Sequence, residues 1–160
     1  MGAISLYSIL VTIHQLGLDI GLGTCTVTYA VSTYGLFKPS IMPQAASFFK
    51  LFSLLIWVGL ALLVISGIGL SITSREVYGE ALKGWPFYVK LIFVGIATLN
   101  GLYLNFIVTP AIEKAVKLED FAHTKEYFRA MVLGLIGGFI SATSWYGSFF
   151  FGIYVFKFSV

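Results

Sequence analysis

Long runs of this 160-residue sequence contain no charged side chain. Asp, Glu, Lys and Arg are absent from residues 51–74, 91–112 and 130–156, and Asp19 is the one such residue before Lys38. An α-helix needs about 20 mostly apolar residues to cross the hydrocarbon core of a membrane. Only 11% of the residues are charged, against about 25% in ordinary soluble domains. The chain is therefore predicted to be an all-α membrane protein.

The spacing of the charges predicts four transmembrane helices. We expect them at roughly 4–30, 50–73, 86–109 and 127–157, packed as one bundle in a single domain over residues 1–160. Four such helices with their loops use most of the chain. No sizeable soluble catalytic domain fits beside them.

Turn-forming and polar residues lie between the expected helices. Tyr34, Gly35 and Pro39 are expected to break the chain after the first span, and Pro110 to end the third. The polar segment 113–126 is predicted to form a short helix at the membrane interface, between the third and fourth spans. Aromatic rings suited to the interface lie near expected span ends at Trp85, Tyr88, Tyr127 and Tyr154.

The distribution of Lys and Arg predicts an orientation in the cell membrane. Cytoplasmic loops carry an excess of positive residues. Because no Lys or Arg precedes Lys38, the first helix is expected to be a retained span rather than a signal peptide. We expect the loops after the first and third spans in the cytoplasm and both termini outside. Six positive residues against four favour this: Lys38, Lys50, Lys114, Lys117, Lys125 and Arg129, against Arg75, Lys83, Lys90 and Lys157.

Composition and motifs exclude several classes of function. The formal net charge is +3 and no basic run occurs, so nucleic-acid binding is not expected. A zinc or copper site needs three or four converging ligands, and the expected spans contain only His14, Asp19 and Cys25. Because no nucleophile, base and acid can be assembled from the spans, no catalytic residue is assigned and an enzyme is not expected.

The first expected helix carries polar and small residues on two sides. Helices associate in lipid through close packing of small residues, so such stripes predict contact surfaces. A helix that is polar on two sides is expected either at the centre of its bundle or between its own bundle and a partner. One stripe comprises Tyr7, Leu10, His14, Gly17, Gly21, Thr24 and Thr28, and the other Ser8, Thr12, Gln15, Asp19, Gly23 and Thr26.

Asp19 is the residue least compatible with lipid. An ionised Asp at a helix centre costs about 2.5–3.5 kcal/mol on translocon scales, so its carboxyl is expected to be protonated, paired or facing water. We expect an intramembrane polar network of Asp19 with Gln15, Lys90, Asn100 and Asn105. Such a group indicates a proton or ion relay, or a polar anchor for a cofactor or neighbouring subunit; simple pairing with Asn100 or Gln15 is the structural alternative.

His14 allows a second hypothesis, a haem b site. An imidazole can ligate haem iron, and a nearby glycine lets the porphyrin approach the backbone. His14 with Gly17 and Gly21 meets the local part of that description. His123, the other histidine, is expected at the opposite membrane face. A haem held by two histidines of one chain is therefore not expected. Two arrangements stay open: a five-coordinate haem held by His14 alone, or a haem whose second ligand comes from another copy of the chain.

Several short motifs together resemble a family of small, uncharacterised prokaryotic four-helix membrane proteins. That family is distantly similar to copper-resistance-D-type and b-type cytochrome bundles, whose intramembrane histidines hold haem or metal. The resemblance implies such a role for His14 alone, because Asn105 stands where some relatives have a second histidine near the end of the third helix. The motifs are Ile13–Gly17 and Gly21–Thr24 (IHQLG and GLGT), Ile56–Leu60 (IWVGL), Leu63–Gly67 (LVISG), Lys90, Asn100–Leu102 (NGL), Pro110 and Ser144–Tyr146 (SWY).

Three functional hypotheses follow. The first is a small polytopic structural or accessory subunit in the lipid bilayer, associated with copies of itself or with a larger membrane complex. The second is a haem-b electron carrier that uses His14. The third is a proton or small-solute conductor that uses Asp19.

Overall fold

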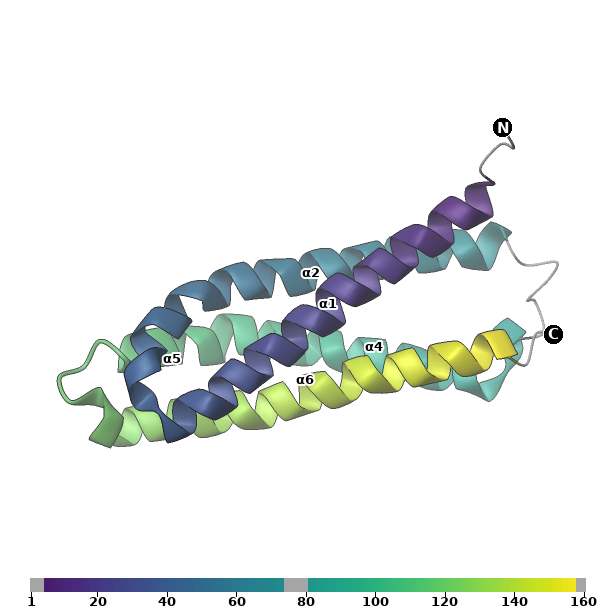
Figure 1. Ribbon diagram of the computed structural model, residues 1–160. Helices are drawn as coiled ribbons and strands as arrows, with labels where there is room; N and C mark the ends of the chain where they lie inside the picture. The colour runs from purple at the N-terminus through teal and green to yellow at the C-terminus, as the bar shows by residue number, and fades with distance from the viewer. Residues whose placement is uncertain (1–4, 74–80, 158–160) are drawn as a thin grey trace.

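A computed structural model describes residues 5–73 and 81–157 of the chain (Figure 1). Over these two ranges the chain is helical and contains no strand. Four helical stretches in the described residues are long and apolar enough to cross a membrane: Leu6–Phe37, Pro39–Thr73, Trp85–Ala115 and Lys125–Val155. The prediction of an all-α chain with four candidate spans is confirmed.

The first two helices run further into their connection than predicted. Helix α1 spans Leu6–Phe37 and α2 spans Met42–Thr73, with the 3₁₀ turn η1 (Pro39–Ile41) between them. The expected break at Tyr34 and Gly35 is wrong, because Gly35 is buried inside α1. A Cβ at Gly35 would collide with the Met42 side chain. The extra turns of α1 and α2 therefore pack against each other instead of forming a loop.

Pro110 does not end the third helix, contrary to the prediction. Helix α4 (Trp85–Tyr103) continues through a π-helical segment, η3 (Leu104–Val108), into α5 (Thr109–Ala115). At the segment's end the Thr109 N–H donates to the Leu104 carbonyl, five residues back. This wider turn changes the register just before Pro110, which then lies in the first turn of α5, where its missing N–H is tolerated.

The polar segment 113–126 does not form the separate interfacial helix that was predicted. Its first residues complete α5, its middle holds the short 3₁₀ helix η4 (Phe121–His123), and α6 (Lys125–Lys157) begins within its last residues. Asp120 precedes η4 in the left-handed region, with a φ of 49°. The side chain of Asp120 bonds to His123, with 2.9 Å between Oδ1 and Nδ1. Local turns therefore replace a helix here.

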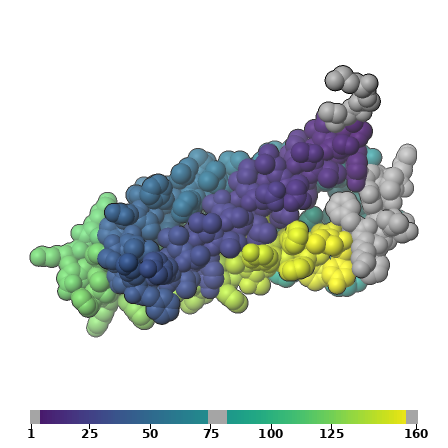
Figure 2. Space-filling view, in the orientation of Figure 1, coloured from purple at the N-terminus to yellow at the C-terminus, as the bar shows by residue number. Residues whose placement is uncertain are grey.

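The four long helical stretches form two antiparallel pairs. Helix α1 packs along α2, and α4 packs along α6 (Figure 1). The pairs are joined by contacts of α1 with α6 and of α2 with α5. In the space-filling view α1 crosses one face of the molecule (Figure 2). Neighbours on both of its sides are therefore α2 and α6, and the rest of its surface faces outward.

Glycines bring α1 and α2 into backbone contact. A Cβ added at Gly17 would lie 2.9 Å from the Gly59 carbonyl oxygen, and one at Gly59 would lie 2.6 Å from the Gly21 nitrogen. On its other side Gly21 packs against the Trp145 ring of α6. The stripe centred on Gly17 and Gly21 is thus the inner face of α1, which confirms it as a contact surface.

A second core lies at the α1–α2 turn. It gathers buried side chains of α2, α5 and α6, including Met42, Phe49, Ile112 and Met131. Tyr127 belongs to this core rather than to the interface as predicted, since it is 3% exposed. Its hydroxyl donates to the Gly35 carbonyl at 3.0 Å. Tyr127 therefore ties the start of α6 to the end of α1.

The glycine contacts predict how single alanine substitutions affect stability. We expect Gly17→Ala to lower the free energy of unfolding by about 1–3 kcal/mol, because the added methyl meets backbone and forces the helices apart. Gly95→Ala in α4 is the matched control. A Cβ at Gly95 meets nothing within 4 Å, so better helix propensity should leave stability unchanged or raise it by about 0.5–1 kcal/mol. SDS titration in mixed micelles, followed by circular dichroism, measures both; equal effects would contradict the proposed contact.

Candidate functional site

His14 joins three helices through hydrogen bonds. Its Nδ1 lies 2.9 Å from the Ser66 hydroxyl of α2, and its Nε2 lies 3.4 Å from the Lys90 ammonium of α4. Glycines lie beside both side chains. A Cβ at Gly67 of α2 would lie 3.6 Å from His14 Cε1, and one at Gly152 of α6 would lie 3.6 Å from Lys90 Nζ, both ordinary van der Waals distances. The pair is thus packed against α2 and α6.

The hydroxyl hydrogen of Ser66 decides which atom donates in each of these bonds. The Ser66 hydroxyl has one hydrogen, which it donates to the Leu62 carbonyl. Ser66 must therefore accept from His14, which assigns the proton of a neutral ring to Nδ1. The Nε2 atom is then the acceptor for an N–H of Lys90. The result is one chain of donors from Lys90 through His14 and Ser66 to the Leu62 carbonyl.

This geometry does not fit a haem iron at His14. Both ring nitrogens are already in hydrogen bonds. The space beside Gly17 is filled by the backbone of α2, and the space beside Gly21 by Trp145. No room is left for a porphyrin against these glycines. Among the residues described, no three His, Cys, Asp or Glu side chains gather where they could hold a metal ion.

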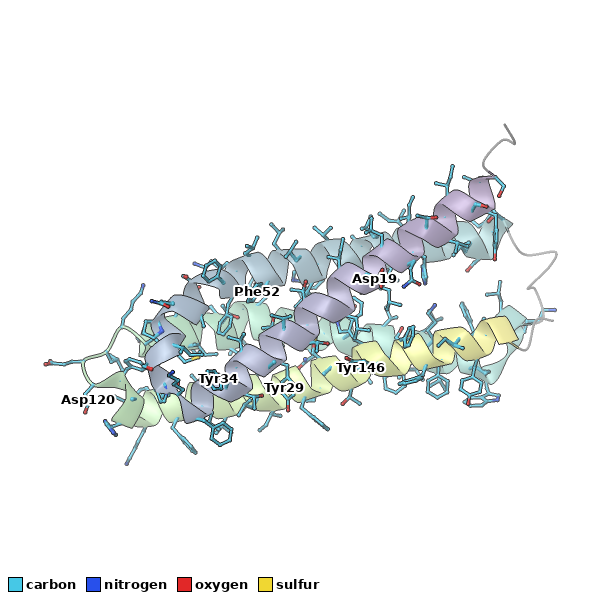
Figure 3. The ribbon with its side chains drawn as sticks, in the orientation of Figure 1. Asp19, Tyr29, Tyr34, Phe52, Asp120 and Tyr146 are labelled. Carbon is cyan, nitrogen blue, oxygen red and sulfur yellow. The ribbon has the colours of Figure 1, made fainter. Side chains whose placement is uncertain are left out.

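Asp19 pairs within its own helix. The Gln15 side-chain amide donates to Asp19 Oδ1 at 2.9 Å. Of the two partners expected for Asp19, the structure therefore has Gln15 and not Asn100. Asp19 and Gln15 are both exposed, and Figure 3 labels Asp19 on α1. No other hydrogen bond or ion pair to Asp19 is present in the described part of the chain. The carboxyl is therefore unpaired except for one neutral amide.

The stripe that contains Asp19 lies on the outside of the protein along its whole length. Every member is exposed. The Thr12 and Thr26 hydroxyls bond back to carbonyls of their own helix, and Thr26 also lies 3.3 Å from the Tyr146 hydroxyl of α6. We call this surface the outer stripe: Ser8, Thr12, Gln15, Asp19, Gly23 and Thr26.

The other predicted network residues bind elsewhere. Asn100 donates from Nδ2 to the Gly137 carbonyl of α6 at 2.7 Å. Asn105 accepts at Oδ1 from the Ser53 hydroxyl of α2 at 2.9 Å. Lys90 contacts His14 rather than Asp19. The five residues therefore belong to separate pairs in different parts of the bundle rather than to one network.

Sequence reasoning missed the partners that complete these pairs. Ser66, Gly137 and Ser53 are small residues, and in a transmembrane sequence small residues first suggest close packing. The sequence does contain one signal for Ser66: it stands next to Gly67, so a hydroxyl and a residue without a side chain adjoin on one helix. That combination could have indicated a polar contact with a neighbouring helix. Comparisons with known proteins add no partner or function: no family model, curated protein or solved structure matches the chain.

The His14–Lys90 bond should be measurable as a coupling free energy. We expect a double-mutant cycle of His14→Phe and Lys90→Met to give about 0.6 kcal/mol, the average for hydrogen bonds between transmembrane helices, and no more than about 1.7 kcal/mol, the largest value found. Unfolding in mixed micelles supplies the free energies. The pair His14 and Asn100, which share no bond, is the control and should give additive effects. A coupling no larger than in the control would rule out the bond.

Absorption spectra test the fit of haem at His14. We expect protein from haem-supplemented cells to lack a Soret band of its own, because both nitrogens of His14 are hydrogen-bonded and the adjoining glycines are covered. The spectrum of His14→Ala provides the baseline. A Soret band in the wild type that disappears in His14→Ala would contradict this reading of the site.

Proposed function

We propose that the chain is a multi-pass protein of the cell membrane that acts as a structural or accessory subunit. In this proposal it assembles through α1, either with copies of itself or within a larger membrane complex. The positive-residue distribution supports segments 31–50 and 110–129 on the cytoplasmic side and both termini outside.

The outer stripe is the observation that carries the proposal. In a bilayer it would expose Asp19, Gln15 and two threonines to lipid. The cost for Asp alone is about 2.5–3.5 kcal/mol at a helix centre. One bond from Gln15 leaves most of the carboxyl's acceptor capacity unfilled. A neighbouring helix that offers hydrogen-bond donors would remove this cost.

The surface beside the outer stripe also favours a packed neighbour. A shallow hollow of about 500 Å³ lies between α1, α4 and α6. Thr26 and Tyr146 stand at its edge, and Phe93 and Gly147 form part of its lining. Its residues are mostly apolar, so a hydrophobic side-chain ridge would fill it. An apolar hollow and the polar outer stripe thus adjoin on one side of α1, because Thr26 belongs to both.

The other two hypotheses receive less support. Both ring nitrogens of His14 are hydrogen-bonded and its neighbouring glycines are covered, which does not favour haem. The similarity to cytochrome-type bundles stays a prediction. For conduction, Asp19 would need further polar groups leading into the bundle. Among the described residues its hydrogen bond goes to Gln15 on the same exposed face.

Removal of the Asp19 carboxyl should weaken the assembly. We expect the wild type, extracted in mild detergent, to elute as a species larger than a monomer, and Asp19→Leu to shift it toward the monomer. Light scattering after size exclusion measures the mass. Ser47→Leu, which removes an exposed polar group from α2, is the control and should leave the mass unchanged. A wild type that is a stable, lone monomer would count against the proposal.

A further inference from the structure

A cavity of about 80 Å³ lies between the two helix pairs of the bundle. Residues of α1, α2, α4, η3, α5 and α6 line it. Its walls combine apolar side chains with polar ones, and none of the lining residues is charged. The polar groups that matter for its chemistry are Ser32, Ser53, Asn105, Thr109 and Ser141.

Two of these side chains are incompletely hydrogen-bonded. Ser32 is 7% exposed, and its hydroxyl has no partner in the described part of the chain. Asn105 accepts at Oδ1 from Ser53, while its Nδ2 group has no partner among the described residues. A buried polar group without a hydrogen bond destabilises the fold unless water or another group bonds to it. The cavity therefore contains donors and acceptors that lack partners.

The π-helical segment adds a free carbonyl at the same place. In a helix the Asn105 carbonyl would accept from residue 109 or, in a π-turn, from residue 110. The Thr109 N–H bonds to the Leu104 carbonyl instead, and Pro110 has no N–H. The Asn105 carbonyl therefore has no donor within its own helix. Such freed backbone groups are tolerated at membrane depth where they face protein or a water-filled cavity.

We propose that this cavity is an internal hydrated site that binds water molecules. One water needs about 10–15 Å³ of such volume, so several fit. Unpaired N–H and O–H donors occur beside an unpaired carbonyl, and this mixture suits water, which both donates and accepts. Anions lack a positive group in the lining, and divalent cations lack the carboxylates they require. The site is separate from the outer stripe and excludes ions.

Cys25 provides a built-in probe of this water. It is the one cysteine of the chain, lines the cavity and is 4% exposed. Its S–H stretch in the infrared spectrum is therefore assignable to one residue. After transfer of the purified, folded protein from H₂O to D₂O, we expect the S–H band to be replaced by S–D within minutes, because water inside the cavity reaches the thiol.

Variants separate cavity water from general opening of the bundle. We expect Asn105→Leu, which fills the site with apolar surface, to slow this exchange about tenfold, because apolar cavities stay dry. Asn100→Leu is the matched control on the same helix: Asn100 bonds to Gly137 and does not line the cavity, so exchange should keep its rate. Should Asn105→Leu not fold, Ser32→Val replaces it, with the buried Ser144→Ala as its control.

Three outcomes would overturn the proposal. The first is a wild-type S–H band that persists for as long as the amide protons in the core of α1. The second is an equal slowing by the cavity variant and its control. Faster exchange in the cavity variant than in its control would also contradict a hydrated site.

Discussion

The backbone contact of α1 with α2 determines where every polar group of α1 points. Gly17 and Gly21 lie against Gly59, so the rotation of α1 about its axis is fixed. His14 is three residues before Gly17 and therefore shares the inner face. Asp19 is two residues after Gly17, about 200° around the helix, and must face outward. The inner His14 pair and the outer stripe are thus two consequences of one helix crossing.

Pro110 has a comparable effect on the third span. A proline inside a transmembrane helix is tolerated when the freed backbone groups find other partners. Here the π-turn at Leu104–Val108 shifts the hydrogen-bonding register so that Pro110 lies in the first turn of α5, where no N–H is needed. The helix therefore continues to Ala115. The continued helix places Glu113 within 3.3 Å of Lys50 of α2. The same change of register leaves the backbone carbonyl of Asn105, a residue that lines the cavity, without a donor in its own helix.

Patterns within one helix were predictable from the sequence, and contacts between helices were not. Both stripes of α1, and the pairing of Gln15 with Asp19, follow from a spacing of three or four residues, which helix geometry fixes. The pairing of Lys90 with His14 depends on how far two helices are shifted along each other, which spacing does not encode. Tyr127 was misplaced for the same reason, since an aromatic ring near a span end suits either the interface or a core. Pro110 was misread because the π-turn has no simple sequence signal.

Asp19 of α1 and Lys90 of α4 do not pair with each other. Lys90 is directed to the inner face of α1, where Nε2 of a neutral His14 accepts a hydrogen bond from its Nζ. Asp19 lies on the outer face of the same helix and has one amide partner. A salt bridge between them would require α1 to rotate, which would move Gly17 and Gly21 out of contact with α2 and Trp145. Packing of α1 against α2 and pairing of Asp19 with Lys90 therefore exclude each other within this chain.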